Sequence, residues 1–150
     1  MPLVVSGFPG VGKTHFSSTT AGVNDSDSSN FGWAKTAPGE AKRRDPEWPN
    51  NYIAHIKRLL GRAEVTYIMV SSHQEVRDAL VAEGIHFALV YPSADIKAEY
   101  IQRYKDWGNS PGFVKLLDIN YEDWVAGLEA QPGCEHRPLK TGQYLSDVLT

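Results

Sequence analysis

The sequence predicts an α/β fold of three layers, in which a parallel sheet is flanked by helices. Apolar runs of strand length alternate along the chain with amphipathic runs of helix length. The apolar runs are uninterrupted, which is typical of strands buried on both faces. The chain has 150 residues, of which 41% are hydrophobic, so we expect residues 1–150 to form a single domain.

The elements follow in chain order. Leu3 to Ser6 predicts a short buried strand, and Lys13 to Thr20 a helix. Further strands are expected at Val23-Asn24, Val65–Ser72 and Ile85–Pro92, with a last one within 134–142. Further helices are expected from an Asn50 or Asn51 cap to Gly61, over His73–Gly84 and Ser93–Gly108, once or twice within 110–130, and over 143–149. The polar stretch 30–49 is long for a connection and predicts a functional or mobile loop.

The strongest motif is GFPGVGKT, from Gly7 to Thr14, which has the spacing G-x-x-x-x-G-K-[ST] of a Walker A loop. A predicted strand precedes it and a predicted helix follows it, as phosphate binding requires. Glycines let successive N–H groups turn toward an anion, and the helix start adds partial positive charge. Lys13 reaches the β- and γ-phosphates, and the Thr14 hydroxyl is a ligand for Mg²⁺. The predicted nucleotide site comprises Gly7, Pro9, Gly10, Val11, Gly12, Lys13, Thr14 and His15, with ATP and Mg²⁺ as cofactors.

Composition narrows the class of protein. A net charge of −3 disfavours a broad nucleic-acid surface, although a local basic groove is compatible with it. The chain has one cysteine, no apolar run of membrane-spanning length and no signal-peptide pattern, so we expect a cytoplasmic protein. The D-x-x-G and [NT]-K-x-D strings of regulatory GTPases do not occur. The strand from Val65 ends in Ser71-Ser72-His73, where a large ATPase carries an acidic residue.

These motifs together resemble the P-loop kinases that act on nucleosides, nucleotides or polynucleotide ends. The resemblance rests on GFPGVGKTHF, NDSDSS, PNNYIAHIKRLL, VTYIMVSSHQEVRDAL and FALVYPSADIKAEYIQRYKDWGN, and is greatest to short kinase-like proteins common in phage genomes. It implies the P-loop NTPase fold with a small helical lid at 93–110, an acceptor loop at 25–50, and, for a phage protein, the host cytoplasm.

The resemblance also implies roles for single residues. An acidic residue after the second strand accepts the proton of an attacking hydroxyl, and Asp27, or alternatively Asp25, takes this position. In monophosphate kinases the same region instead holds the acceptor, and Asp25 is the residue expected to bind it. Both carboxylates equally fit a solvated turn. Arg103 matches a lid cation that stabilises the transferred phosphoryl group. Lids of this kind usually carry a second arginine where Lys105 or Trp107 stands.

Three further features point to the phosphoryl acceptor. Arg77, one turn into its helix, suits an acceptor phosphate or a surface ion pair. Trp33 offers a stacking surface for an acceptor base, or anchors the loop. The basic run Lys42 to Arg44 suits a nucleic-acid backbone or a solvated loop.

The sequence therefore predicts a Mg²⁺-dependent ATP phosphotransferase, a kinase of nucleoside monophosphates or nucleosides. A polynucleotide or hydroxymethyl-DNA kinase is the first alternative, with nucleic acid as substrate. A nucleotide-binding module without catalysis is the second.

Overall fold

The chain folds around one parallel sheet. Its structure is a computed structural model that describes residues 2–26 and 45–149. In these residues five strands form a sheet in the order β2-β3-β1-β4-β5, and every neighbouring pair is parallel. The strands are β1 (Leu3–Gly7), β2 (Val23–Asp25), β3 (Tyr67–Ser71), β4 (Phe87–Pro92) and β5 (Glu135–Leu139).

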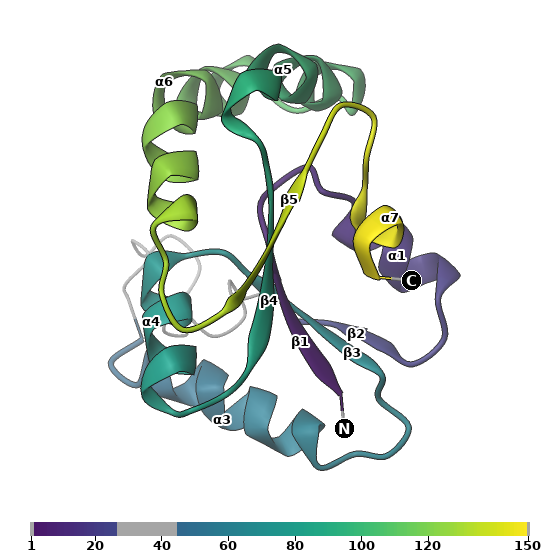
Figure 1. Cartoon of the computed structure of the whole chain (residues 1–150), viewed down its shortest axis with the longest axis vertical. Helices are drawn as coiled ribbons and strands as arrows, with labels where there is room; N and C mark the ends of the chain where they lie inside the picture. Colours follow the sequence, from purple (N-terminus) through teal and green to yellow (C-terminus); the bar gives the residue numbers. More distant parts are fainter. Residues whose placement is uncertain (1, 27–44, 150) are drawn as a thin grey trace, which may run out of the picture.

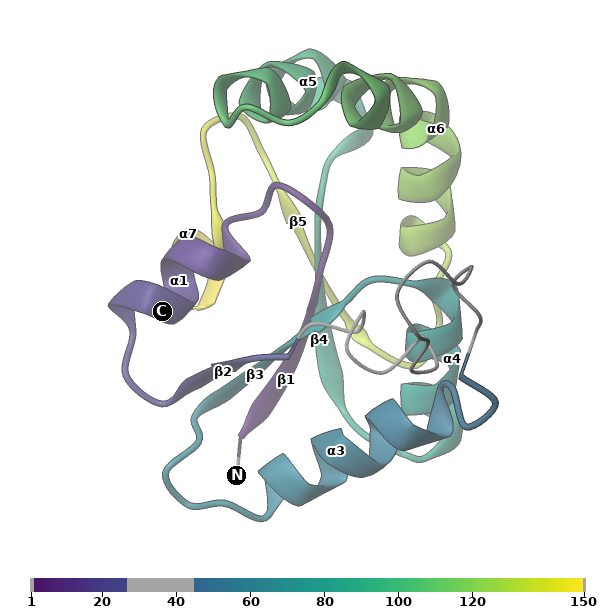
Figure 2. The same cartoon turned by 180° about the vertical axis from the view of Figure 1, so that it is seen from behind.

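Helices cover both faces of the sheet (Figures 1 and 2). One face carries α1 (Lys13–Thr19) and α7 (Leu145–Leu149), and the other carries α3 (Asn50–Leu60) and α4 (Gln74–Ala82). A short 3₁₀ turn, η1 (Ala94–Ile96), leads from β4 into α5 (Lys97–Asp106), which lies beyond the carboxyl ends of the strands. From there α6 (Pro111–Glu129) descends past β4. The predicted α/β architecture is confirmed, and it is compatible with a P-loop fold.

The register of the sheet brings the ends of β1 and β3 to one level, two residues before the end of β4. Gly7, the last residue of β1, pairs with Ser71 of β3 and with Val90 of β4. The central position of β1 explains its composition, because Val4 and Val5 are covered on both sides and completely buried. The segment after Gly7 therefore leaves the sheet in the middle of its carboxyl edge.

An aromatic cluster fixes that segment against α5 and α6. The Phe8 ring meets Tyr100 and Tyr121 edge to face, with centroids 6.3 Å and 5.9 Å apart. The Tyr104 hydroxyl donates to the Pro9 carbonyl at 2.6 Å. These tyrosines are buried, and burial raises the pKa of Tyr100 to about 12, so it stays neutral. The loop after β1 is thus held from behind by neutral, packed side chains.

Several element boundaries differ from the sequence prediction. The helix expected over Ser93–Gly108 is divided into η1 and α5, and it ends at Asp106 because Gly108 adopts a left-handed φ of 75°. The residue at the N-cap of α3 is Pro49 rather than Asn50 or Asn51, so the capping prediction is wrong. The 110–130 region forms one helix, capped by Ser110, whose side chain accepts from the Phe113 amide.

The sequence has no apolar run of membrane-spanning length, and the helices of the structure can be compared with that expectation. Within residues 2–26 and 45–149, no helix is long and apolar enough to cross a bilayer.

Candidate functional site

The loop between β1 and α1 has the backbone that its glycines predict. Gly10 and Gly12 take φ values of +94° and +97°, which residues with a Cβ rarely adopt. Space is limited as well: a Cβ on Gly10 would lie 2.9 Å from Cε1 of Tyr104, and one on Gly12 would lie 3.2 Å from Cδ1 of Tyr144. Both positions therefore require glycine for conformation and for fit.

The loop delivers a cation and a hydroxyl to the start of α1. Lys13 Nζ donates to the Gly7 carbonyl at 2.9 Å, which folds the side chain back across the loop. Thr14 is exposed in the first turn of the helix. The hydrogen bonds of α1 begin with the Phe16 amide, which donates to the Gly12 carbonyl at 2.9 Å. The amides before it point out of the start of α1, as at any helix N-terminus.

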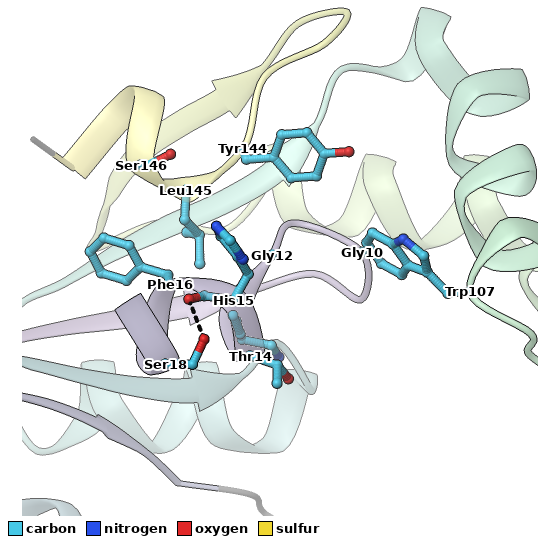
Figure 3. Close-up of a pocket in the computed structure, with 11 residues that line it drawn as sticks. Gly10, Gly12, Thr14, His15, Phe16, Ser18, Trp107, Tyr144, Leu145 and Ser146 are labelled. Atoms are coloured by element: carbon cyan, nitrogen blue, oxygen red, sulfur yellow. Dashed lines mark hydrogen bonds between the residues drawn. The ribbon is translucent and has the colours of Figure 1, made fainter. Parts of the chain in front are cut away.

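A cavity of about 760 Å³ opens over this loop (Figure 3). Its inner part is formed by Gly10, Gly12, Lys13 and Thr14, together with His15. The rest of its wall, which we call the outer part, is formed by Phe16 and Ser18 of α1, Trp107 just after α5, Tyr144 just before α7, and Leu145 and Ser146 of α7. The volume is within the range of sites for small molecules of nucleotide size.

The predicted nucleotide-binding residues divide into two groups. Gly10, Gly12, Lys13, Thr14 and His15 line the cavity. Gly7, Pro9 and Val11 instead shape the loop. The Gly7 carbonyl accepts from Lys13, the Pro9 carbonyl from Tyr104, and Val11 is fully buried with its carbonyl bound to the Leu145 amide at 3.0 Å.

Arg103 lies behind the loop. It is only 7% exposed, and its guanidinium donates to the carbonyls of Gly10 at 2.8 Å and Gln143 at 3.0 Å. It also pairs with Glu99 at 2.9 Å and lies over the ring of Tyr144, 3.9 Å from its centroid. These contacts connect α5, the loop between β1 and α1, and the segment before α7. In this conformation the predicted lid cation contacts backbone carbonyls of the site rather than lining the cavity.

The predicted acceptor side lies at the end of β2. Asp25 ends this edge strand and is exposed. Next to it the buried Ser26 hydroxyl donates to Asn24 Oδ1 at 2.6 Å and lies 3.0 Å from Nε2 of His55. Burial, with Arg58 and Arg62, lowers the pKa of His55. Asp27, Trp33 and the Lys42–Arg44 run lie outside the described residues, so the choice between Asp25 and Asp27 as the base stays a prediction.

Arg77 lies apart from the cavity. It is 7% exposed, and its guanidinium donates to the Ser72 carbonyl at 2.9 Å, the Gly127 carbonyl at 3.3 Å and Gln131 Oε1 at 2.9 Å. Burial lowers its pKa. The structure therefore joins Arg77 to the end of α6, and places it neither with Lys13 nor with Asp25.

The chemistry of the oxygen donors near the loop fits Mg²⁺. This ion prefers oxygen ligands, keeps several waters and is bound by few protein groups when phosphates share it. Thr14 offers an exposed hydroxyl, and the Ser71 hydroxyl, at the strand end paired with Gly7, is buried without a hydrogen-bond partner. No group of three or more histidine, cysteine, aspartate or glutamate side chains that could hold a metal occurs in the described residues.

Sequence reasoning missed the outer part of the cavity. Tyr144, Leu145 and Ser146 reach it because β5 is parallel to β1, so the chain that follows β5 also emerges at the carboxyl edge. That rule was a usable signal for this segment. Trp107 lies in the segment 93–110 that the resemblance gave as the lid, but nothing in the strand pattern assigned its side chain to the cavity.

Comparison with protein-family models, with curated proteins and with solved structures gives no match.

Proposed function

We propose that this chain is a Mg²⁺-dependent ATP phosphotransferase, a kinase of a nucleoside monophosphate or a nucleoside. The observation that carries the proposal is the glycine loop between β1 and α1, with Lys13 and Thr14 in the wall of a nucleotide-sized cavity. A glycine-rich turn without ligand would have no need of a lysine and a hydroxyl on the same open surface.

In this proposal the loop and Lys13 bind the phosphates of the donor. When a phosphate enters, Lys13 Nζ exchanges its bond to the Gly7 carbonyl for phosphate oxygens, and the loop glycines admit the phosphates close to the backbone. Thr14 would hold Mg²⁺, which supplies charge neutralisation for the phosphates when bound. Arg103 keeps the loop in place through the Gly10 carbonyl. Its predicted contact with the transferred group requires it to leave that carbonyl.

The acceptor would enter beside β2, where Asp25 presents an exposed carboxylate. For a hydroxyl acceptor, a carboxylate here, Asp25 or Asp27, takes the proton as the oxygen bonds to the γ-phosphorus and the bond to the β-phosphate breaks, releasing ADP. A monophosphate acceptor needs little help from a base. The exposed carboxylate also favours a second candidate, transfer to a polynucleotide end or a hydroxymethylated base in DNA.

The test is transfer from γ-labelled ATP with Mg²⁺ to a panel of nucleosides, monophosphates, 5′-hydroxyl oligonucleotides and hydroxymethylated DNA. Labelled monophosphate or nucleoside product supports the first candidate, and labelled nucleic acid the second. If ATP binds but nothing is labelled, the chain is a nucleotide-binding module without catalysis and the proposal is wrong.

A further inference from the structure

The outer part of the cavity differs in chemistry from the phosphate loop. Beyond Lys13 and Thr14, aromatic and aliphatic side chains provide much of its surface. Trp107 is 53% exposed at the end of α5, and Tyr144 is 38% exposed at the start of α7. Figure 3 shows Tyr144 above Gly12 and Trp107 beside Gly10. If a triphosphate occupies the loop, as the proposed function requires, the base of the donor reaches this outer part.

Backbone groups of the segment before α7 are already used within the protein. The Tyr144 amide donates to the Asp147 carboxylate at 2.7 Å, and the Leu145 amide to the Val11 carbonyl at 3.0 Å. The Gly142 amide donates to Glu99 at 3.1 Å, and the Gln143 amide to Lys140 at 3.0 Å. These amides cannot also donate to a ring nitrogen of a base. The segment therefore lacks, at these positions, the fixed donors that distinguish adenine from guanine.

Apart from Lys13 and Thr14, the polar side chains that line the cavity do not fix a pattern of donors and acceptors. They are the imidazole of His15 and the hydroxyls of Tyr144 and Ser146, together with the Ser18 hydroxyl, which already donates to the His15 carbonyl at 2.9 Å. A hydroxyl donates or accepts by rotation, and a neutral imidazole does so by changing its tautomer. No amide, carboxylate or guanidinium side chain lines the cavity in the part of the chain that the structure describes. Such groups are the ones that hydrogen-bond one base and reject another.

Arg103 makes the Tyr144 ring a rigid part of this wall. The guanidinium lies between Tyr144 and Tyr100, 3.9 Å and 4.4 Å from their centroids. An ordered ring offers a stacking surface with little loss of side-chain entropy, and stacking is similar for all bases because each has a π-face.

We propose that the donor site holds the base of its nucleotide by stacking against Trp107 and Tyr144 without reading its hydrogen-bonding edge, so that ATP and GTP are accepted alike. This inference rests on the proposed function, because it needs a triphosphate on the phosphate loop. It adds that the purine base contributes to affinity and not to the choice of donor.

The experiment is calorimetric titration of the full chain with MgATP, MgGTP and magnesium tripolyphosphate. ATP and GTP should bind with dissociation constants within about tenfold of each other, and both more tightly than tripolyphosphate. Trp107→Ala should weaken ATP and GTP by the same factor, about fivefold or more, and should leave tripolyphosphate unchanged. Trp107→Phe should restore most of the affinity. Trp124→Ala is the matched control, since Trp124 is 41% exposed on α6 and does not line the cavity.

Two results would overturn the inference and leave the proposed function standing. One is a preference of more than about tenfold between ATP and GTP, which would require a hydrogen-bonded base. The other is unchanged affinity for both nucleotides in Trp107→Ala. If neither nucleotide nor tripolyphosphate binds, the phosphate loop has no ligand of this kind, and the proposed function fails with the inference.

Discussion

Two polar clusters on opposite faces of the sheet are built in contrasting ways. On one face, the loop before α1 presents Lys13 and Thr14 to a cavity. On the other face, Arg77 of α4 donates to Gln131, whose own carbonyl lies 2.7 Å from Nε2 of His136. The second ring nitrogen of His136 lies 2.9 Å from the Tyr91 hydroxyl. The first cluster opens onto a cavity, and the second is closed by protein groups.

The contrast separates residues that line a cavity from residues that hold elements together. Burial raises the pKa of the Cys134 thiol and of Tyr91 in the closed cluster, so both stay neutral and the thiol is a poor nucleophile. A buried charged side chain that bonds three carbonyl oxygens, as Arg77 does, fixes the end of α6 against α4. From sequence the glycine loop is the stronger signal, whereas Arg77 suits either an acceptor phosphate or a surface ion pair.

Lys13→Ala should have the largest effect. Removal of a charge-assisted contact to two phosphates should weaken ATP binding by about 3 kcal/mol, or more than about hundredfold, and abolish transfer. Thermal stability should change little, because Lys13 is only partly buried. Titration calorimetry measures ATP affinity, the transfer assay measures activity, and a thermal melt measures stability. The control is Lys115→Ala, which removes an exposed lysine of α6. If Lys13→Ala bound ATP as tightly as the wild type, the two clusters would no longer differ in ligand binding.

Arg77→Ala should produce the opposite pattern. Three oxygen acceptors lose their donor, so the free energy of unfolding should fall by about 2–3 kcal/mol, measured by urea titration. ATP affinity of the folded variant should stay at the wild-type value. A variant with wild-type stability but lost transfer to the acceptor would instead place Arg77 in the acceptor site, as the sequence first suggested.

Gly10→Ala should lower ATP affinity less than Lys13→Ala does, and should lower stability less than Arg77→Ala does. The left-handed backbone costs about 1–2 kcal/mol with a Cβ, and the new methyl group meets the Tyr104 ring at 2.9 Å. Both Tm and ATP affinity should fall. Gly127→Ala is the matched control, because its Cβ meets nothing within 4 Å and alanine favours the helix by up to about 1 kcal/mol. If Gly10→Ala matches Gly127→Ala, the loop is not as tightly held as we infer.

The smallest effect concerns pH and His55. Burial holds the pKa of His55 below its ordinary value of 6.5, so the folded protein resists a proton that the unfolded chain takes up. Stability should therefore be complete above about pH 6.5 and should decrease as the pH falls below it. His55→Gln, which keeps a donor for Ser26, should flatten this dependence of Tm, whereas His86→Gln at an exposed position should not. If Tm depended on pH in the same way in the wild type and in His55→Gln, His55 would not be the group that causes the loss of stability at low pH.

The sequence predicted the elements better than it predicted the partners of charged side chains. Apolar runs located the strands and the glycine spacing located the loop, because both depend on local chemistry. The surroundings of Arg103 and Arg77 depend on how α5 and α6 pack, and local patterns do not encode that packing. The positions of Trp107 and Tyr144 in the cavity wall likewise depend on tertiary packing. Hydrogen-bond partners 40 to 93 residues away along the chain, as for Arg103, require the tertiary structure.

The most direct test of the central claim is phosphoryl transfer from γ-labelled ATP with Mg²⁺, measured in parallel for the wild-type chain and Lys13→Ala. The claim predicts a labelled nucleotide, nucleoside or nucleic-acid product from the wild type and none from the variant. Tight ATP binding by the wild type with no labelled product, or equal product from both chains, would contradict it.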